Sequence, residues 1–185
     1  MAQNDEFTVD IVSDFVCPWC YVGDIRFEEA LRRAAPETKI SFRWLPFELN
    51  AAMPEGGMDR KEYLANKFGG PEKLQQIEAR MEQVGKEDGI KFRHDLIQKS
   101  PNTFKAHRLN WLAAKEGKSD EIARKIFEGY FTKGLDIGDD ATLAKIAGEA
   151  GMDEKKVKAF LASGEGIDEV RKLEDGARER GIRMV

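Results

Sequence analysis

The chain has 185 residues and a net charge of −4, and hydrophobic residues make up 41% of it and charged residues 35%. This composition is typical of a folded domain and argues against disorder, while the lack of an apolar run of about 18 residues argues against a transmembrane helix. The mixed charge gives no electrostatic reason to expect nucleic acid or a membrane as a partner. The first residues are acidic and polar, unlike a secretory signal, so we expect a cytoplasmic protein.

The N-terminal part has the pattern of a strand, a helix and a second strand. Residues 7–12 alternate apolar and polar side chains and are rich in β-branched residues, which predicts a strand. Residues 21–34 carry apolar side chains at spacings of three and four, which predicts an amphipathic helix, and Pro18 fits its first turn. Residues 39–49 alternate again, although Pro46 limits how far an interior strand can run. Together these elements predict two parallel strands joined by a crossover helix.

Cys17 and Cys20 are the only cysteines and form a C-x-x-C motif between the first strand and the helix. Two cysteines are too few for a disulfide scaffold. A structural zinc site needs four ligands, and His94 and His107 lie far downstream, so we expect no metal. A single buried cysteine is most simply an inert core residue. The C-x-x-C spacing, in a chain without a signal sequence, instead favours redox chemistry.

The place of this motif predicts its chemistry. A helix N-terminus offers unpaired N–H donors and a partial positive charge, so we expect the pKa of Cys17 to lie below its ordinary value. Cys17 is then the attacking nucleophile. Cys20, one turn later and expected to be more enclosed, is the resolving thiol. Pro18 and Trp19 are expected to tune the exposure and redox potential of the pair.

Helical patterns dominate the chain after a loop at residues 50–58. The expected helices span residues 59–68, 71–88, 103–116, 120–132, 140–150, 153–162 and 167–181. The side chains expected to cap helix N-termini are those of Asp59, Asn102, Ser119, Asp139 or Asp140, and Asp153. The middle helices predict a helical insertion at residues 59–166, between an N-terminal part at 1–58 and a return to the same domain at 167–185.

The two histidines receive different interpretations. His107 shares a predicted helix face with Phe104 and Trp111, so it is either a core or interface histidine or a wall of the active-site cleft. His94 lies in a charged, loop-like stretch, and we expect it at the surface.

The ten residues from Asp14 to Gly23, which contain the C-P-W-C motif, resemble the FrnE-like branch of the DsbA family of thiol–disulfide oxidoreductases. This branch belongs to the thioredoxin-like superfamily, with 2-hydroxychromene-2-carboxylate isomerases and kappa-class glutathione transferases. Further similar stretches are residues 42–50, 102–108 and 180–185, and the last of these resembles the start of the family's third strand. The resemblance implies an α/β, thioredoxin-like fold with a large α-helical insertion. It also implies that Cys17 attacks and Cys20 resolves.

The resemblance also implies which residues lie near the motif and which molecules react with it. It places Phe15, Asn102 and His107 at substrate-binding positions near the dithiol. The expected partners are protein or small-molecule thiols and disulfides. The expected redox group is the Cys17–Cys20 disulfide itself, with no other cofactor, although glutathione is a candidate redox partner.

Two other functions stay open. Isomerases of this group use glutathione and usually carry serine at the first cysteine position, whereas this chain has Cys17, which favours the oxidoreductase. A glutathione-dependent isomerase or transferase is the second hypothesis. A non-enzymatic interaction module, in which the helical part binds a partner, is the third.

The resemblance also concerns the C-terminal part. Members of the family continue after a stretch like residues 181–185 with a cis-proline, two strands and a final helix. We therefore expect that the C-terminal strands are missing from this chain and that residues beyond Val185 exist. The alternative is a short form that takes the missing sheet edge from a partner or from a second copy in a homodimer.

Overall fold

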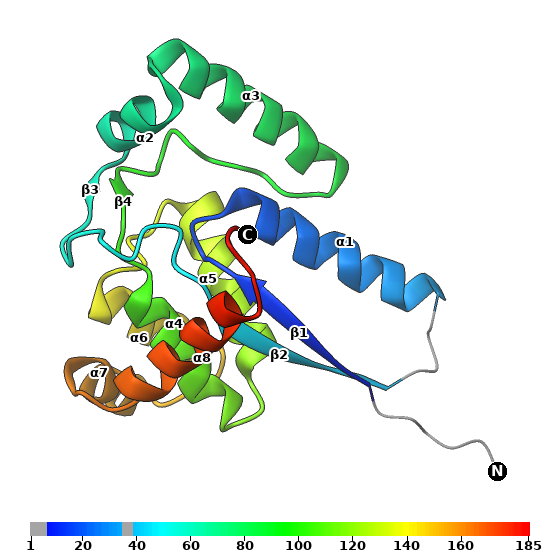
Figure 1. Ribbon diagram of the computed structural model, residues 1–185, viewed down its shortest axis with the longest axis vertical. Coiled ribbons are helices and arrows are strands. Elements are labelled where there is room, and N and C mark those ends of the chain that lie inside the picture. The colour runs from blue at the N-terminus through cyan, green and yellow to red at the C-terminus, as the bar shows by residue number, and fades with distance from the viewer. Residues whose placement is uncertain (1–6, 35–38) are drawn as a thin grey trace.

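The computed structural model describes residues 7–34 and 39–185 (Figure 1). The acidic residues 1–6, used above as an argument about a signal sequence, lie outside the described part. Strand β1 (Phe7–Ser13), helix α1 (Pro18–Ala34) and strand β2 (Ile40–Pro46) follow one another along the chain. The two strands pair in parallel, with Val9 opposite Phe42 and Ser13 opposite Pro46. The predicted strand–helix–strand unit is confirmed.

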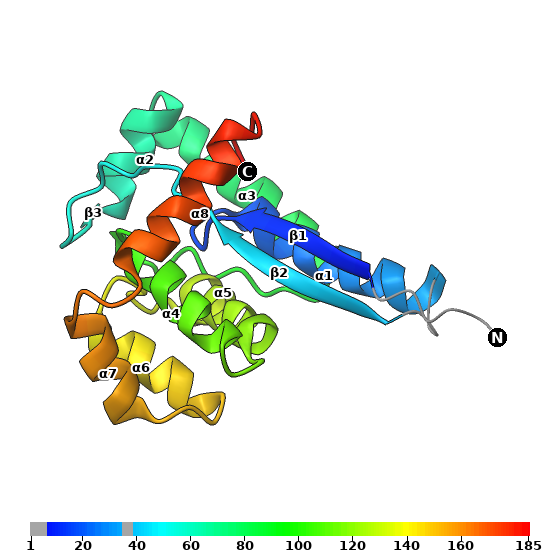
Figure 2. The ribbon, with the colours of Figure 1, turned by 60° about the horizontal axis from the view of Figure 1, so that its bottom comes forward.

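Helix α1 lies along one side of the strand pair (Figure 2). Phe27 of α1 meets Phe42 of β2 edge-on, with ring centroids 5.8 Å apart. Strand β2 ends at Pro46, three residues before the predicted end. Proline cannot donate a ladder hydrogen bond, which accounts for the earlier end.

The remaining helices agree with the sequence to within two residues at either end. They are α2 (Arg60–Phe68), α3 (Pro71–Glu87), α4 (Phe104–Ala114), α5 (Ser119–Lys133), α6 (Asp140–Glu149), α7 (Glu154–Ala162) and α8 (Ile167–Glu179). The sequence analysis missed one feature, a short antiparallel pair formed by β3 (Met58–Asp59) and β4 (Lys99–Ser100). Each of these strands has only two residues, too few for an alternating pattern.

Most of the predicted helix caps are confirmed. The carboxylates of Asp59, Asp139 and Asp153 accept backbone N–H groups in the first turns of α2, α6 and α7. Asn102 lies one residue before the N-cap of α4, and its side-chain oxygen accepts the Phe104 N–H at 2.9 Å. The prediction for Ser119 was wrong, because Ser119 is the first residue inside α5.

One apolar core joins the strand–helix–strand unit to the helical part. Phe127 of α5 lies at its centre and stacks on Tyr21 of α1, with ring centroids 5.3 Å apart. It also packs against Trp44 of β2. The predicted boundaries of the helical insertion stay predictions, since this core runs across them.

Helix α8 is held against the segment that follows β2. The buried Glu174 carboxylate accepts the Glu48 backbone N–H at 2.9 Å, and Arg178 donates to Glu174 at 2.8 Å and to the Glu48 carbonyl oxygen at 3.1 Å. Arg171 also pairs with the Glu48 carboxylate. After α8 the chain turns back toward the start of α1 (Figure 1).

Residues 182–185 form no strand within the described part of the chain, whereas the sequence predicted the start of a third strand there. Their backbone pairs with neither β1 nor β2. None of the helices in the described ranges is both long and apolar enough to cross a bilayer.

Candidate active site

The C-P-W-C motif lies at the N-terminus of α1, as predicted. Cys17 directly precedes the helix, and its N–H donates to the Asp14 carbonyl oxygen at 3.0 Å. Pro18 is the first helical residue, where a missing N–H costs no hydrogen bond. Trp19 is about half exposed at the surface beside the motif. The backbone N–H groups of Trp19 and Cys20 both point at the Cys17 sulfur.

The relative burial of the two thiols differs from the prediction. Both cysteines are reduced, but Cys17 is only 3% exposed while Cys20 is partly exposed. The C-terminal segment contacts this thiol, since the Cys17 sulfur lies 3.5 Å from the Val185 carbonyl oxygen, which accepts its hydrogen. Nevertheless, Cys17 lines the main cavity of the molecule. Cys20 packs against the apolar core instead. Access from the cavity therefore favours Cys17 as the attacking sulfur.

The two thiols affect each other's ionisation. Cys17 donates to the Cys20 sulfur, and this hydrogen bond lowers the pKa of Cys20 to about 7, helped by the Ser13 hydroxyl and the Asp14 backbone N–H. The same hydrogen bond and burial raise the pKa of Cys17. The sequence predicted the lowered pKa at Cys17. In this conformation the helix N–H groups are outweighed there by the second sulfur and by burial. The pair still provides one thiolate near neutral pH.

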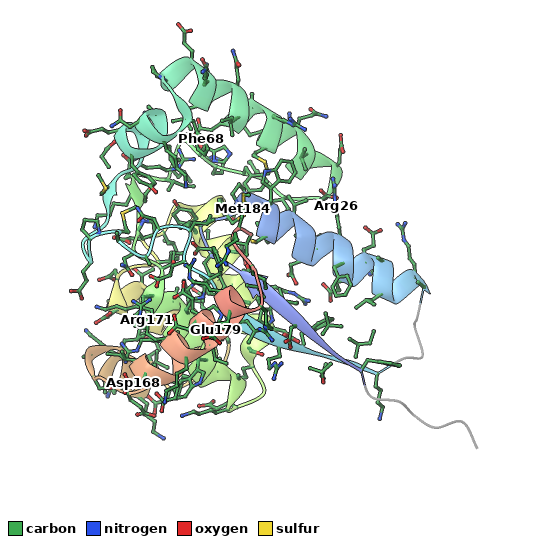
Figure 3. All side chains as sticks on the ribbon, in the orientation of Figure 1. Arg26, Phe68, Asp168, Arg171, Glu179 and Met184 are labelled. Atoms are coloured by element: carbon green, nitrogen blue, oxygen red, sulfur yellow. The ribbon has the colours of Figure 1, made fainter. Side chains whose placement is uncertain are left out.

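A cavity of about 400 Å³ lies next to Cys17, between the motif and helices α2 and α3. In Figure 3, Phe68 marks the α2 side of this region and Met184, next to Val185, marks the C-terminal segment. The side chains that α2 and α3 contribute are mostly apolar: Leu64, Phe68, Leu74, Ile77 and Met81. Lys67 and Arg80 also line it and form no ion pair within the described part of the chain. The cavity is therefore apolar with a cationic rim.

A buried polar cluster forms part of the cavity wall. Arg60 donates to Glu78 at 2.5 Å and lies 3.2 Å from Nδ1 of His94. His94 is only 7% exposed and stacks on Phe92, so the prediction of a surface histidine was wrong. Burial, together with the Arg60 charge, lowers the pKa of His94 to about 4, which keeps the ring neutral at pH 7. This cluster could not be predicted from local sequence patterns, because its members are far apart in the chain.

The three predicted substrate-binding residues lie behind the motif and do not line the cavity. Phe15 is fully buried and packs on Phe127, with ring centroids 5.2 Å apart. Asn102 donates to the Met53 carbonyl oxygen at 2.8 Å, so it holds a loop that does line the cavity. These positions support the site without touching its open space.

His107 is also buried, at 6% exposure, and its ring lies against Phe15 with centroids 4.8 Å apart. Its Nε2 atom lies 3.5 Å from the Asp14 carboxylate. Of the two interpretations left open, a buried histidine fits this environment better than a cleft wall. Asp14, which the sequence analysis did not single out, lines the cavity and connects His107 to the dithiol.

No group of three or more potential metal ligands occurs among residues 7–34 and 39–185.

Comparison with known proteins shows which family this arrangement represents. Residues 8–183 match the family of DSBA-like thioredoxin domains. The chain belongs to this family. The expected thioredoxin-like fold with helical additions is thereby confirmed, and the match is consistent with the FrnE-like branch.

Individual known proteins are also similar to this chain. The chain is similar to a probable DsbA oxidoreductase from Streptomyces coelicolor, with 31% identity and a TM-score of 0.89 over 96% of this chain and 77% of that one. An uncharacterized protein from Bacillus subtilis, YwbO, is 28% identical over 153 residues, which are 83% of this chain and 70% of the relative. A 2-hydroxychromene-2-carboxylate isomerase shares the fold, with a TM-score of 0.72 and 16% identity over 95% of this chain and 81% of that one.

Proposed function

We propose that this protein is a thiol–disulfide oxidoreductase that uses the Cys17–Cys20 dithiol. The observation that carries the proposal is the position of the motif: Cys17 directly precedes α1 and lines the cavity, and Cys20 lies in the first turn of the same helix. A cysteine at a helix N-terminus, next to a cavity and with a second thiol one turn away, is placed for thiol–disulfide exchange. Membership of the DSBA-like family supports this function.

The reaction has two steps. Cys17 passes its proton to the Cys20 thiolate, and its sulfur attacks one sulfur of a substrate disulfide. A mixed disulfide forms, and the other substrate sulfur leaves as a thiolate that takes up a proton. Cys20 then loses its proton and attacks the Cys17 sulfur. The Cys17–Cys20 bond forms, the mixed disulfide breaks, and the second substrate thiol leaves. The substrate gains two electrons, and the protein loses them.

The cavity favours substrates that carry an apolar group near the reacting sulfur. Its walls from α2 and α3 are apolar, and Lys67 and Arg80 at the rim favour a negative charge on the substrate. Both a peptide and a small thiol meet this description. No other cofactor is proposed, and a cytoplasmic place in the cell stays a prediction.

A second candidate is a glutathione-dependent isomerase or transferase. It is favoured by a cavity beside Cys17 that leaves room for another reactant, and by the fold shared with the isomerase. In that case activity on a chromene-type substrate requires glutathione and survives the loss of Cys20. Activity without glutathione would exclude this candidate.

The test uses Cys17→Ser and Cys20→Ser, which preserve the size of each side chain. We expect Cys17→Ser to lose disulfide exchange, and Cys20→Ser to accumulate a mixed disulfide with the substrate, detected by mass spectrometry. A glutathione redox titration of the unaltered protein measures the equilibrium. The proposal fails if both variants exchange disulfides as the parent does.

A further inference from the structure

Two buried side chains beneath the motif have polar atoms without hydrogen bonds. Asp14 is 1% exposed, and neither its Oδ1 nor the Nε2 of His107 has a hydrogen-bond partner among the described residues. The two atoms face each other across 3.5 Å. Buried polar groups are nearly always paired, so such a pair beside a reactive site requires an explanation.

Asp14 is fixed relative to the dithiol by three contacts. Its carbonyl oxygen accepts the Cys17 N–H at 3.0 Å, and its backbone N–H points at the Cys20 sulfur. Its Oδ2 atom accepts the Leu49 N–H at 2.7 Å. The backbone contacts hold Asp14 beside the dithiol, and the Leu49 N–H holds its carboxylate in place. Its negative charge raises the pKa of Cys20, against the larger lowering by the Cys17 thiol.

His107 approaches from the opposite side, on α4. Its backbone N–H donates to the Thr103 carbonyl oxygen at 3.0 Å, and Phe15 supports its ring. In the tautomer that carries its hydrogen on Nε2, the ring places a donor 3.5 Å from the Asp14 carboxylate and reduces the effect of that charge on its surroundings. The imidazole thus acts on the sulfurs only through Asp14.

Few other ionisable groups face this pair. Within the described residues, Glu48 after β2 interacts with His107, and Tyr130 of α5 interacts with Asp14. The two cysteines of α1 complete the set. Glu48 is balanced by Arg171. The carboxylate of Asp14 is therefore the negative charge placed to act directly on the dithiol.

We propose that Asp14 and His107 are positioning residues that set the dithiol–disulfide equilibrium with opposite signs. The Asp14 carboxylate disfavours the thiolate, and His107 weakens that effect. This inference rests on the proposed oxidoreductase function.

The equilibrium in question is the reaction of the reduced protein with glutathione disulfide. The Cys17–Cys20 bond forms, the glutathione disulfide bond breaks, and two protons pass from the cysteines to two glutathione thiols. Only the reduced protein carries a thiolate, so the Asp14 charge destabilises the reduced form and leaves the disulfide form unaffected.

The experiment compares Asp14→Asn, His107→Gln and the double variant with the parent. Two quantities are measured: the equilibrium constant with glutathione, and the pH dependence of Cys17 alkylation by iodoacetamide. Asparagine keeps the acceptor for the Leu49 N–H. Asp24→Asn is the matched control, because Asp24 is another buried aspartate, located on α1 and paired with Arg124.

We expect Asp14→Asn to shift the equilibrium toward the reduced protein by roughly three- to tenfold and the alkylation midpoint to lower pH, since a nearby charge of like sign is removed. His107→Gln shifts both in the opposite direction, because the carboxylate then acts unopposed. In the D14N background, His107→Gln has a smaller effect than it has alone. Asp24→Asn leaves both quantities near those of the parent.

Three results would overturn the inference: an unchanged equilibrium in Asp14→Asn, shifts of the same sign in both single variants, or an equal shift in Asp24→Asn. If Asp14→Asn does not fold, the sign of the His107→Gln shift still decides the question. Failure of the proposed function is distinct, because the parent protein then forms no Cys17–Cys20 disulfide in any glutathione buffer.

Discussion

Two neighbouring residues of α4, His107 and Arg108, are both buried, but they differ in how many hydrogen bonds their polar atoms make. Arg108 donates five hydrogen bonds to backbone carbonyl oxygens of residues 160–165, at 2.6–3.2 Å. The Nε2 atom of His107 makes none. Arg108 faces the turn between α7 and α8, whereas His107 faces the Asp14 carboxylate. The comparison distinguishes Arg108, whose hydrogen bonds stabilise the fold, from His107, whose ring nitrogen is left to act on the Asp14 carboxylate.

The same contrast holds on a larger scale. A further buried atom without a partner among the described residues is His94 Nε2, on the cavity wall, while Glu48, Asn110 and Asp140 carry others elsewhere. Selection for stability alone removes such atoms or pairs them.

The comparison predicts its largest effect for Arg108→Met, which should lower the free energy of unfolding. Methionine keeps the apolar length of the side chain but leaves several buried carbonyl oxygens without donors. We expect a loss of about 3 kcal/mol or more in the free energy of unfolding, measured by urea denaturation. Disulfide exchange per folded molecule stays at the parental level. A loss below about 1 kcal/mol would show that the carbonyl groups find other donors.

The second prediction concerns pH and His94. Its pKa is lowered from 6.5 to about 4 in the folded protein, so the unfolded chain binds the proton first as the pH falls. The stabilisation by neutral His94 is complete above about pH 6.5 and is lost as the pH falls toward 4. We expect a loss of about 2 kcal/mol between pH 6.5 and pH 4.5, measured by urea denaturation.

His94→Gln is the control for this prediction, because glutamine is not ionised in this range. The variant should lose less stability than the parent over the same interval. Equal losses in both proteins would mean that other groups, such as the buried carboxylates, cause the acid sensitivity.

The sequence predicted the elements well because each carries its own local signal. Helix α1, for example, follows from apolar spacing and from Pro18 in its first turn, and three aspartates mark the starts of later helices. The position of the C-x-x-C motif follows from the same local reasoning. Local pattern is therefore sufficient for the helices, for β1 and β2 and for the place of the dithiol, but not for the two-residue strands β3 and β4.

The surroundings of the dithiol could not be predicted in this way. The burial of Cys17 depends on Val185, at the other end of the chain. The partner of Arg60 and the burial of His94 depend on how α3 and the following loop pack onto α2. Such features arise from tertiary contacts between distant segments, so no periodic pattern records them.

The smallest predicted effect is the change in the free energy of unfolding caused by His107→Gln. Because Nε2 makes no hydrogen bond in the folded protein, its loss leaves no donor or acceptor newly unpaired, and glutamine retains much of the packing against Phe15. We expect a change of about 1 kcal/mol or less in the free energy of unfolding, by the same urea measurement as for Arg108→Met. A loss as large as that of Arg108→Met would mean that His107 is needed chiefly to hold the fold. A small loss, together with a shifted exchange equilibrium, would assign adjacent residues of one helix to stability and to reactivity.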